Sequence, residues 1–518
     1  TLSRATTGGT LSIVAGTTLR IGGTGSISAN YSVPILDCTS NIEYYGSNQI
    51  VRGINYGNLL LSGSGVKTMQ PGTTSICNDI IVSGTAQLVA ANTLNIGRNV
   101  SVGASAKLKG GNHTFNVAGT FEMQGTFEYD SSTVNFNGGS PVVVYPGNFY
   151  NVIFSGYGTK TAIGSLNVKG DMTINTKFNA GSFSHSLAGN FVNNGSFIAA
   201  SSTIVLEGTA MQTISGSSST TFHHLTINGT QDFILATSSV VSGTLNLTKG
   251  LLSLGNNNLR VSAVSGGSAL SYVKTNGLGT LRRRISGGGS EVVFPVGNST
   301  YNPIGITNTT PADSDYYFVR VVDEIPSLAN DSTKTVYHKW YITEFTPGGS
   351  ALTIRVTYDS SSGVGANFNP AFTPVIGYFT GSKWAAAMPA TVSSYTFSSA
   401  VGAFVTDDMT GSDDYFCLGS GDAFSASRLA IVDMRPATPF VNHPNVSIMI
   451  EAQNSLGIPV DLSSTTTYDL TAFNTSFSAI PSGSIFAGAS RDTLSNLTFT
   501  TASTTATVQA DRTSGENL

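Results

Sequence analysis

Short runs of alternating apolar and polar residues recur along the first half of the chain. The segment Thr203–Gly229 opens with such a run, passes Gly208 and a second short apolar run, and closes after a polar turn with a third run. Ser40–Gly63 and Thr133–Gly156 follow the same order. Alternation with a period of two is typical of half-buried strands, and a fixed order of strands and glycine turns indicates a repeat. The pattern therefore predicts stacked coils of short β-strands.

Shorter units lie between the long repeats and place one asparagine between two apolar residues. The unit Leu94–Ile96 is followed by Phe115–Val117 after 21 positions, and Val168 is followed by Leu187 after 19. Coils of about 20 residues with three short strands are typical of a parallel β-helix, and roughly thirteen coils at about 4.8 Å each would fit. Alternation puts the asparagines outside, where Asn116 and its counterparts either stack as a polar ladder or are ordinary surface residues.

The pattern changes near Gly266, where the apolar runs become longer. These runs suit an antiparallel β-sandwich. Trp340 and Trp384 are expected in its core, and the alternative is that they form a ligand platform. About seven short strands from Phe424 onward suit an immunoglobulin-like sandwich without its disulfide. The sequence therefore predicts an all-β fold in three parts: a parallel β-helix over 1–290, a β-sandwich over 291–423 and an Ig-like β-sandwich over 424–518.

Composition limits the classes of function. Only 10% of the 518 residues are charged, 58 are glycine, and the formal net charge is -4. The chain lacks a basic face for nucleic acid, and no apolar run approaches the ~20 residues that insert into a membrane. The longest basic run, Arg282–Arg284, is interpreted as a solvated strand edge. The chain starts at Thr1 without a methionine or a signal peptide, so we expect a processed chain or a piece of a longer one.

The three cysteines do not define a disulfide scaffold. Cys38 and Cys77 would pair if their coils stack, or else remain buried thiols, and the sequence leaves both readings open. The third cysteine is Cys417, and because three is an odd number, at least one of the three has no partner within the chain.

Parallel β-helices also carry polysaccharide lyases and hydrolases, which need clustered carboxylates for Ca²⁺ or two carboxylates at a working separation. Over 1–290 the close acids are Glu122, Glu128 and Asp130, which we interpret as a solvated strand face. His223 and His224 are adjacent, so on a strand their rings would point to opposite faces and hold no metal. We therefore expect no enzyme and no cofactor.

Two sets of residues are candidates for binding. An acidic loop is either a Ca²⁺ site or a solubilising loop, and its acids are Asp407, Asp408, Asp413 and Asp414. Aromatic residues of the long repeats are candidates for a shallow sugar-stacking face, and these are Tyr44, Tyr45, Tyr56, Phe149 and Tyr150.

Three parts of the chain resemble the β-strand-repeat surface and secreted proteins of Bacteroidota that the type IX secretion system exports. The first is TVNFNGG…FYNVIFSG from Thr133, and the second is SYVKTNGLGTLRRR…VVFPVGNSTYNPIGI from Ser271, together with Tyr337–Ile342. The third, IEAQNSLGIPVDL…IFAGAS from Ile450, is similar to invasin-type Ig-like repeats. Such proteins serve as adhesins, gliding-motility filaments and cell-wall-like stalks. Their C-terminal sorting domain is missing here, so we expect further domains to follow.

The resemblance implies an extracellular or cell-surface location and the type IX machinery as the partner in export. It also implies extracellular glycans or other surface proteins as binding partners, and O-glycosylation at Asp-Ser/Thr-X sites, here Ser332 and Thr493. We expect a structural or adhesive, non-catalytic segment of a large surface protein that projects or presents binding surfaces. The alternative is a carbohydrate-binding or polysaccharide-degrading β-helix.

Overall fold

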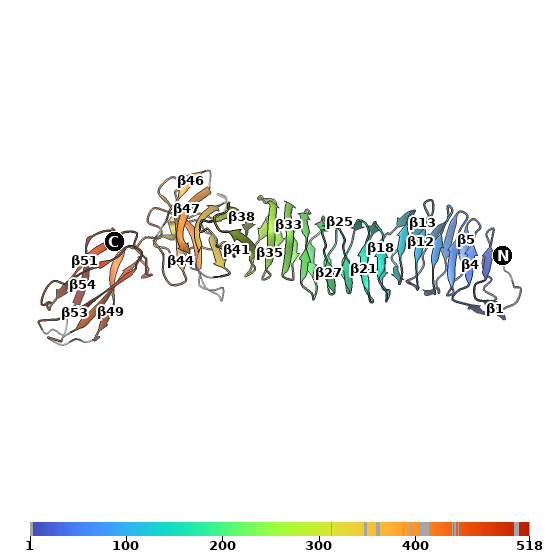
Figure 1. The fold of residues 1–518 in the computed structure, drawn as a ribbon, viewed down its shortest axis with the longest axis horizontal. Helices are drawn as coiled ribbons and strands as arrows, with labels where there is room; N and C mark the ends of the chain where they lie inside the picture. The colour runs from blue at the N-terminus through green and yellow to red at the C-terminus, as the bar shows by residue number, and fades with distance from the viewer. Residues whose placement is uncertain are drawn as a thin grey trace. The chain divides into compact units, whose positions relative to one another are not determined.

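The computed structural model describes residues 4–311, 313–346, 350–358, 363–386, 388–393, 396–404, 414–437, 439, 442–443, 445–501, 507–516 and 518, with the backbone alone at 391–393, 396–404 and 414. The chain forms two compact units, Thr1–Ser271 and Tyr272–Leu518. Both are built from strands (Figure 1), and the described residues contain no α-helix, only the 3₁₀ turn η1 (Ser332–Lys334). A helix of membrane-spanning length and apolarity is absent from these residues.

The fold begins with a parallel β-solenoid of about 14 turns (Figure 1). In the N-terminal unit its strands are β1 (Thr10–Ile13), β2 (Thr18–Ile21), β3 (Val33–Leu36), β4 (Asn41–Tyr44), β5 (Gln49–Val51), β6 (Asn58–Leu61), β7 (Val66–Met69), β8 (Ser75–Ile76), β9 (Ile80–Val82), β10 (Gln87–Val89), β11 (Leu94–Ile96), β12 (Val100–Val102), β13 (Lys107–Lys109), β14 (Thr114–Val117), β15 (Phe121–Met123), β16 (Thr126–Glu128), β17 (Thr133–Phe136), β18 (Val142–Val144), β19 (Gly147–Phe149), β20 (Asn151–Phe154), β21 (Thr159–Ala162), β22 (Leu166–Val168), β23 (Met172–Ile174), β24 (Lys177–Asn179), β25 (Ser184–Leu187), β26 (Phe191–Asn193), β27 (Ser196–Ile198), β28 (Thr203–Leu206), β29 (Gln212–Ser215), β30 (Thr220–Phe222), β31 (His224–Asn228), β32 (Phe233–Leu235), β33 (Ser239–Lys249), β34 (Leu252–Ser253) and β35 (Leu259–Gly266).

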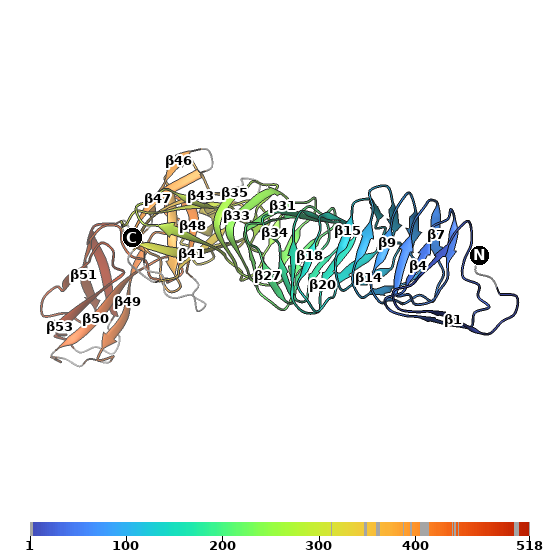
Figure 2. The same cartoon turned by 45° about the vertical axis from the view of Figure 1, so that its right-hand side comes forward.

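Most coils contribute three strands, so that every third strand along the chain becomes a neighbour in a parallel sheet. One sheet runs β8-β11-β14-β17-β20-β23-β26-β29-β32-β34 through most of the unit. The strands of successive coils lie side by side in both cartoon views (Figure 2). The other sheets are β1-β3, β2-β4-β6-β9-β12-β15, β5-β7-β10-β13-β16, β18-β21-β24-β27 and β19-β22-β25-β28-β31-β33-β35.

The registers predicted from the short units are confirmed. Ile96 lies opposite Val117, and Val168 lies opposite Leu187, in neighbouring parallel strands. In the long repeats the first and third runs pair with each other, as Thr133 does with Asn151. Each long repeat is therefore one complete coil plus the first strand of the next.

Inward side chains of successive coils form a continuous apolar core. The strands alternate buried and half-buried positions, and large rings stack from coil to coil. The ring of Phe154 lies 5.8 Å from that of Phe136 and 4.0 Å from that of Phe178, and it is nearly parallel to the latter, with 6° between the planes. An aromatic pair adds about 0.5–1.5 kcal/mol beyond the area that it buries. The core thus holds each coil to its neighbours along the whole unit.

The outward asparagines form a ladder of hydrogen bonds across three coils. The side-chain amide of Asn116 donates to Oδ1 of Asn95 at 2.9 Å, and that of Asn135 donates to Oδ1 of Asn116 at 2.8 Å. Of the two predictions made for these asparagines, the ladder is therefore the correct one. It uses outward polar groups to join coils.

The glycine shared by the long repeats marks a corner where two coils touch. A Cβ atom at Gly46 would lie 1.8 Å from the carbonyl oxygen of Gly23, and one at Gly138 would lie 1.8 Å from that of Ala118. A side chain cannot fit at such a distance, so the corner requires glycine.

Cys38 and Cys77 form a disulfide, which answers the question that the sequence left open. Cys417 is a free, buried thiol in the C-terminal unit. Burial raises the pKa of this thiol well above its ordinary value, which keeps it protonated and unreactive.

The C-terminal unit consists mainly of antiparallel sheets. Its strands are β36 (Val273–Lys274), β37 (Leu281–Ser286), β38 (Val292–Phe294), β39 (Val296–Gly297), β40 (Ile304–Asn308), β41 (Ser314–Val322), β42 (Lys339–Glu344), β43 (Ser350–Thr357), β44 (Pro374–Thr380), β45 (Met388–Pro389), β46 (Thr391–Ser393), β47 (Thr396–Phe404), β48 (Asp414–Ser420), β49 (Arg428–Arg435), β50 (Val446–Gln453), β51 (Thr466–Phe473), β52 (Ser482–Ile485), β53 (Arg491–Leu497) and β54 (Thr507–Ser514).

Two sandwiches make up most of this unit. The first sandwich pairs the sheet β37-β41-β42-β48-β44-β45 with the sheet β38-β40-β43-β47-β46, and the second pairs β49-β50-β53 with β52-β51-β54. Trp340 and Trp384 are fully buried, as predicted. The run Arg282–Arg284 is not a simple solvated edge, because β37 pairs with β41 and the Arg282 guanidinium lies 4.3 Å from the ring centroid of Phe318.

One apolar core continues from the first sandwich into the second. Trp384 and Phe424 belong to the same buried cluster as Val446, Ile448 and Tyr468. The ring centroids of Trp384 and Phe424 are 4.7 Å apart. The two sandwiches are therefore packed together rather than joined by a bare linker.

Candidate functional site: a polar cavity between the two sandwiches

Two hydrogen bonds to the carbonyl group of Leu328 connect the two sandwiches, and we call this connection the joint. Leu328 lies in the loop between β41 and β42. The indole Nε1 of Trp384 donates to this carbonyl at 2.8 Å, and the side-chain amide of Asn454 donates to it at 2.8 Å. Trp384 follows β44 in the first sandwich, whereas Asn454 follows β50 in the second. A carbonyl oxygen can accept two hydrogen bonds, so this one group ties three segments together.

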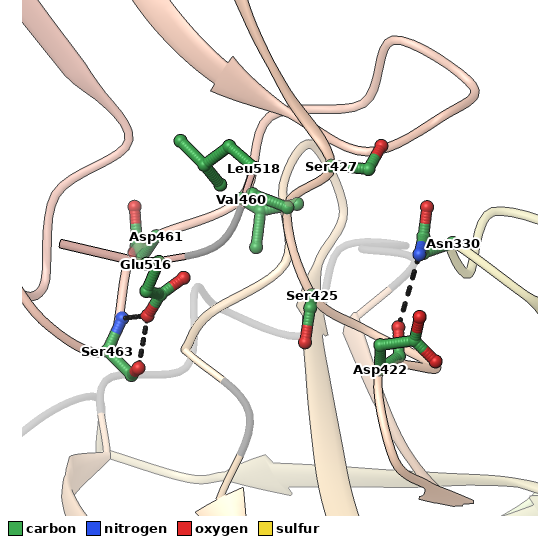
Figure 3. A pocket seen from close by; sticks show the side chains of 10 residues that line it. Asn330, Asp422, Ser425, Ser427, Val460, Asp461, Ser463, Glu516 and Leu518 are labelled. Atoms are coloured by element: carbon green, nitrogen blue, oxygen red, sulfur yellow. Dashed lines mark hydrogen bonds between the residues drawn. The ribbon is translucent and has the colours of Figure 1, made fainter. Parts of the chain in front are cut away.

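A cavity of about 400 Å³ opens beside this joint (Figure 3). Carboxylates, hydroxyls and one amide make up most of its wall, together with a few apolar side chains. The lining residues are Asn330, Asp422, Ser425, Ala426, Ser427, Val460, Asp461, Ser463, Glu516 and Leu518.

Each carboxylate of the cavity already has a partner. Asp422 lies 2.5 Å from the ammonium of Lys334, and Asp461 lies 2.8 Å from that of Lys383. The hydrogen bond and the charge of Asp422 raise the pKa of Lys334. Glu516 accepts hydrogen bonds from the hydroxyl and the backbone N–H of Ser463, as Figure 3 shows. The acids therefore brace the wall of the cavity instead of converging on one point.

Metal binding finds no support in the described part of the chain, where no three His, Cys, Asp or Glu side chains gather around one point. Asp407, Asp408 and Asp413, the predicted Ca²⁺ ligands, lie outside the described residues. Asp414 begins β48, but its side chain is not among those described. The acidic-loop site stays a prediction.

One cluster contains the residue types of a hydrolytic triad in the wrong order. Asp323 accepts hydrogen bonds from Ser299 and, at 2.9 Å, from Nδ1 of His338. Burial opposes ionisation of Asp323, but these hydrogen bonds outweigh it and hold its pKa below the ordinary value. A triad needs the histidine between the serine and the acid. Here the acid lies between them, so Ser299 contacts a carboxylate and not an imidazole base.

The prediction of a sugar-stacking face is wrong for three of its five residues, because their side chains are buried. Tyr44 is 0% exposed, Tyr56 is 2% exposed and Phe149 is 2% exposed. The two tyrosine hydroxyls contact each other at 3.2 Å inside the core, and Phe149 packs against Phe121 with ring centroids 6.1 Å apart. All three rings point into the core, so they cannot offer a face to a sugar.

The other two members of that set remain accessible but lie apart. Tyr45 is 43% exposed and Tyr150 is 36% exposed. The Arg20 guanidinium lies 4.6 Å from the Tyr45 ring centroid, which covers part of that ring. Tyr45 follows β4, which stacks on β2 and β6, whereas Tyr150 precedes β20, which stacks on β17 and β23. These strands belong to different sheets, so the two rings do not form one platform.

The predicted glycosylation residues lie at the surface of the C-terminal unit to different degrees. Ser332 is half-buried in η1, where Asp331 accepts hydrogen bonds from Thr333, and Thr493 is exposed on β53. Modification of either residue stays a prediction.

His223 and His224 do not point to opposite faces. Their ring centroids are 4.3 Å apart, because the chain turns between β30 and β31 at His223. Nδ1 of His224 accepts a hydrogen bond from the backbone N–H of Thr244 at 3.0 Å. The two histidines therefore belong to the turn at the corner of a coil, where His224 binds the backbone of the next coil.

Comparison with known proteins identifies no relative of this chain. No protein-family model matches the chain, and neither the curated proteins nor the solved structures contain a significant match.

Proposed function

We propose that this chain is a structural or adhesive, non-catalytic segment of a large extracellular or cell-surface protein, in which it projects or presents binding surfaces. One observation carries the proposal: in the part of the chain that the structure describes, polar side chains join coil to coil and one sandwich to the other. The asparagine ladder joins coils in this way, and the ion pair of Lys383 with Asp461 joins the first sandwich to the second. A parallel solenoid suits such a role, because each coil repeats the same contacts and displays a long surface.

The disulfide supports a location outside the cytoplasm. Disulfides persist in oxidising compartments and are rare in a reducing cytosol. The pair Cys38–Cys77 and the resemblance to type IX-exported proteins of Bacteroidota favour the same location. We propose export by that machinery, with extracellular glycans or other surface proteins as partners.

Two assays test the proposal together. In the first, the purified chain is incubated with a panel of polysaccharides, and new reducing ends and unsaturated sugars are measured. We expect no product above that of heat-denatured protein, and sustained turnover would overturn the non-catalytic assignment. In the second, antibodies against the chain are applied to intact cells of the source organism. Surface labelling is expected, and labelling only after lysis would contradict the location.

The carbohydrate-binding alternative now rests on Tyr45 and Tyr150 alone. Saturable binding to a soluble glycan that is lost in Tyr45→Ala or Tyr150→Ala would favour it. Tyr44→Ala is unsuitable for this purpose, because Tyr44 belongs to the core and its loss would act through folding.

A further inference from the structure

Two lysines are fully buried inside the N-terminal solenoid. Lys67 on β7 and Lys160 on β21 are both 0% exposed, and each occupies an inward position of its strand. Lysine is among the residue types that are almost never fully buried unless they are paired. Their ammonium groups therefore need partners inside the core.

The ammonium of Lys67 binds three neutral oxygens of the preceding coil. It donates to the carbonyl of Gly46 at 2.7 Å, to that of Ser47 at 2.7 Å and to Oε1 of Gln49 at 2.8 Å. Gly46 is the corner glycine at which two coils touch. Lys67 thus fastens its own strand to the corner of the coil before it.

Gln49 extends this contact by one more coil. Its Oε1 also accepts the backbone N–H of Gly46 at 2.8 Å, and its side-chain amide donates to the carbonyls of Ile21 and Gly25 at 3.0 Å each. Lys67 and Gln49 lie directly opposite each other in β7 and β5. Together the two side chains connect three successive coils.

Lys160 repeats the arrangement just after the second long repeat. Its ammonium donates to the carbonyl of Gly138 at 2.7 Å and to that of Tyr157 at 2.6 Å. Gly138 is the glycine of the second repeat that corresponds to Gly46. The same residue type therefore binds the same carbonyl in two separate coils.

At the third long repeat a glutamine, and no lysine, binds the backbone of the glycine corner. Gln212 accepts the backbone N–H of Gly208 and donates to the carbonyl of Leu187 at 3.0 Å, as Gln49 does in the first repeat. Phe233, just after the third repeat, lies opposite Gln212, at the position that a lysine occupies after each of the other two repeats. The polar group at this corner varies between the copies, but each copy has one.

Burial of an ammonium group is unfavourable unless its hydrogen bonds are satisfied. Burial lowers the pKa of both Lys67 and Lys160, which shows that the hydrogen bonds do not fully offset the cost of burying the charge. A buried charge can fix one arrangement of the chain without adding net stability. A coil shifted along its neighbour would leave the ammonium in the core without its carbonyl partners.

We propose that Lys67 and Lys160 are internal locks, each of which holds the glycine corner of one coil against the strand of the next. The proposal rests on the structural role proposed above and deepens it, because it names two points at which separation of the coils is opposed.

The test is amide hydrogen exchange of the full chain, measured segment by segment. Lys67→Met should speed exchange in residues 44–49 and 62–67 by about 10- to 100-fold. This factor corresponds to the free energy of one hydrogen bond to a charged group. Lys160→Met should do the same in residues 136–141 and 155–160. Lys107→Met, which alters an exposed lysine on β13, should leave both corners unchanged.

Unchanged exchange at the altered corner, or an increase spread evenly over all coils, would overturn the proposal. If Lys67→Met does not fold, Lys67→Gln, which keeps a hydrogen-bond donor, must fold with a protected corner. Failure of both variants would assign the position to packing and would also overturn the proposal. The exchange readout is independent of surface location and of turnover, so its failure is distinguishable from failure of the proposed function.

Discussion

Trp384 and Val460 lie side by side as residues of a parallel sheet do, although they belong to different sandwiches. The backbone N–H of Trp384 donates to the carbonyl of Pro459 at 2.9 Å, and the N–H of Asp461 donates to the carbonyl of Trp384 at 2.8 Å. Buried backbone groups rarely go unpaired, so moving the sandwiches apart would cost these hydrogen bonds as well as the burial of the indole. The joint is therefore part of the fold of both sandwiches.

Replacing the tryptophan should uncouple the two sandwiches. Trp384→Ala removes a fully buried ring and the hydrogen bond to Leu328, and we expect a loss of about 3–5 kcal/mol in the free energy of unfolding. Chemical denaturation followed by fluorescence and by circular dichroism measures this. Phe372→Ala, at an exposed position, is the control. A Trp384→Ala chain that unfolds at the same denaturant concentration as the control would contradict the role of the joint.

The asparagine ladder should contribute to stability by joining coils. Asn116→Ala breaks the hydrogen bonds to Asn95 and Asn135 at once, and we expect a loss of about 1–2 kcal/mol in the free energy of unfolding. Asn112→Ala, at an exposed position, serves as the matched control. Equal denaturation midpoints for the two variants would show that the ladder has no energetic role.

A buried histidine should make the solenoid sensitive to acid. Nδ1 of His185 accepts the N–H of Leu166 at 3.2 Å, and Nε2 lies 2.8 Å from the carbonyl of Ala180, to which it donates in the neutral ring. Burial lowers the pKa of His185 below its ordinary value of 6.5. The unfolded chain therefore takes up the proton first, so this contribution to stability is present above about pH 6.5 and is lost as the pH falls through the folded-state pKa.

Denaturation midpoints measured from about pH 8 to pH 5 test this dependence. His185→Gln should be less stable than the unaltered chain at pH 8, and its midpoint should fall less steeply with acid. His113→Gln, at a half-buried position, should keep the original slope. Identical slopes for His185→Gln and the unaltered chain would refute the assignment.

The disulfide should stabilise the first coils. Cys38 and Cys77 are 39 residues apart, and closing a loop of that length is worth about 4 kcal/mol in the chain-entropy model. Reduction, or replacement of both cysteines by serine, should therefore increase amide exchange over residues 33–82 and leave residues 160–230 unchanged. Exchange that is insensitive to reduction throughout the chain would contradict this role.

The sequence predicts the solenoid well because its determinants are local and repeated. Alternation around Asn116 sets which face is buried, and the recurrence of that unit sets the register of Ile96 against Val117. The same alternation places Tyr44 inward, next to Ile42, so the error over the sugar-stacking face came from treating an aromatic residue as a surface feature instead of applying the pattern.

The joint could not be predicted, because residues 384 and 460 are brought together only by the packing of two sandwiches. The buried lysines were also missed, since lysine is ordinarily read as an exposed residue. A signal for them was present: lysine occurs in GVKT and again in GTKT, at matching points after two long repeats. Repetition of a charged residue at an inward position of a strand indicates an internal role.

Pulling on the single chain from its two ends tests most directly the claim that the protein serves a structural role. The N-terminal solenoid should keep its native length until coils separate in discrete steps, with a pause near Lys160. Lys67 lies within the loop closed by the Cys38–Cys77 disulfide, so a pause near Lys67 is expected only after reduction of that disulfide. Gradual extension at low force, without steps, would mean that the coils do not resist tension as a unit. That result would contradict the structural role.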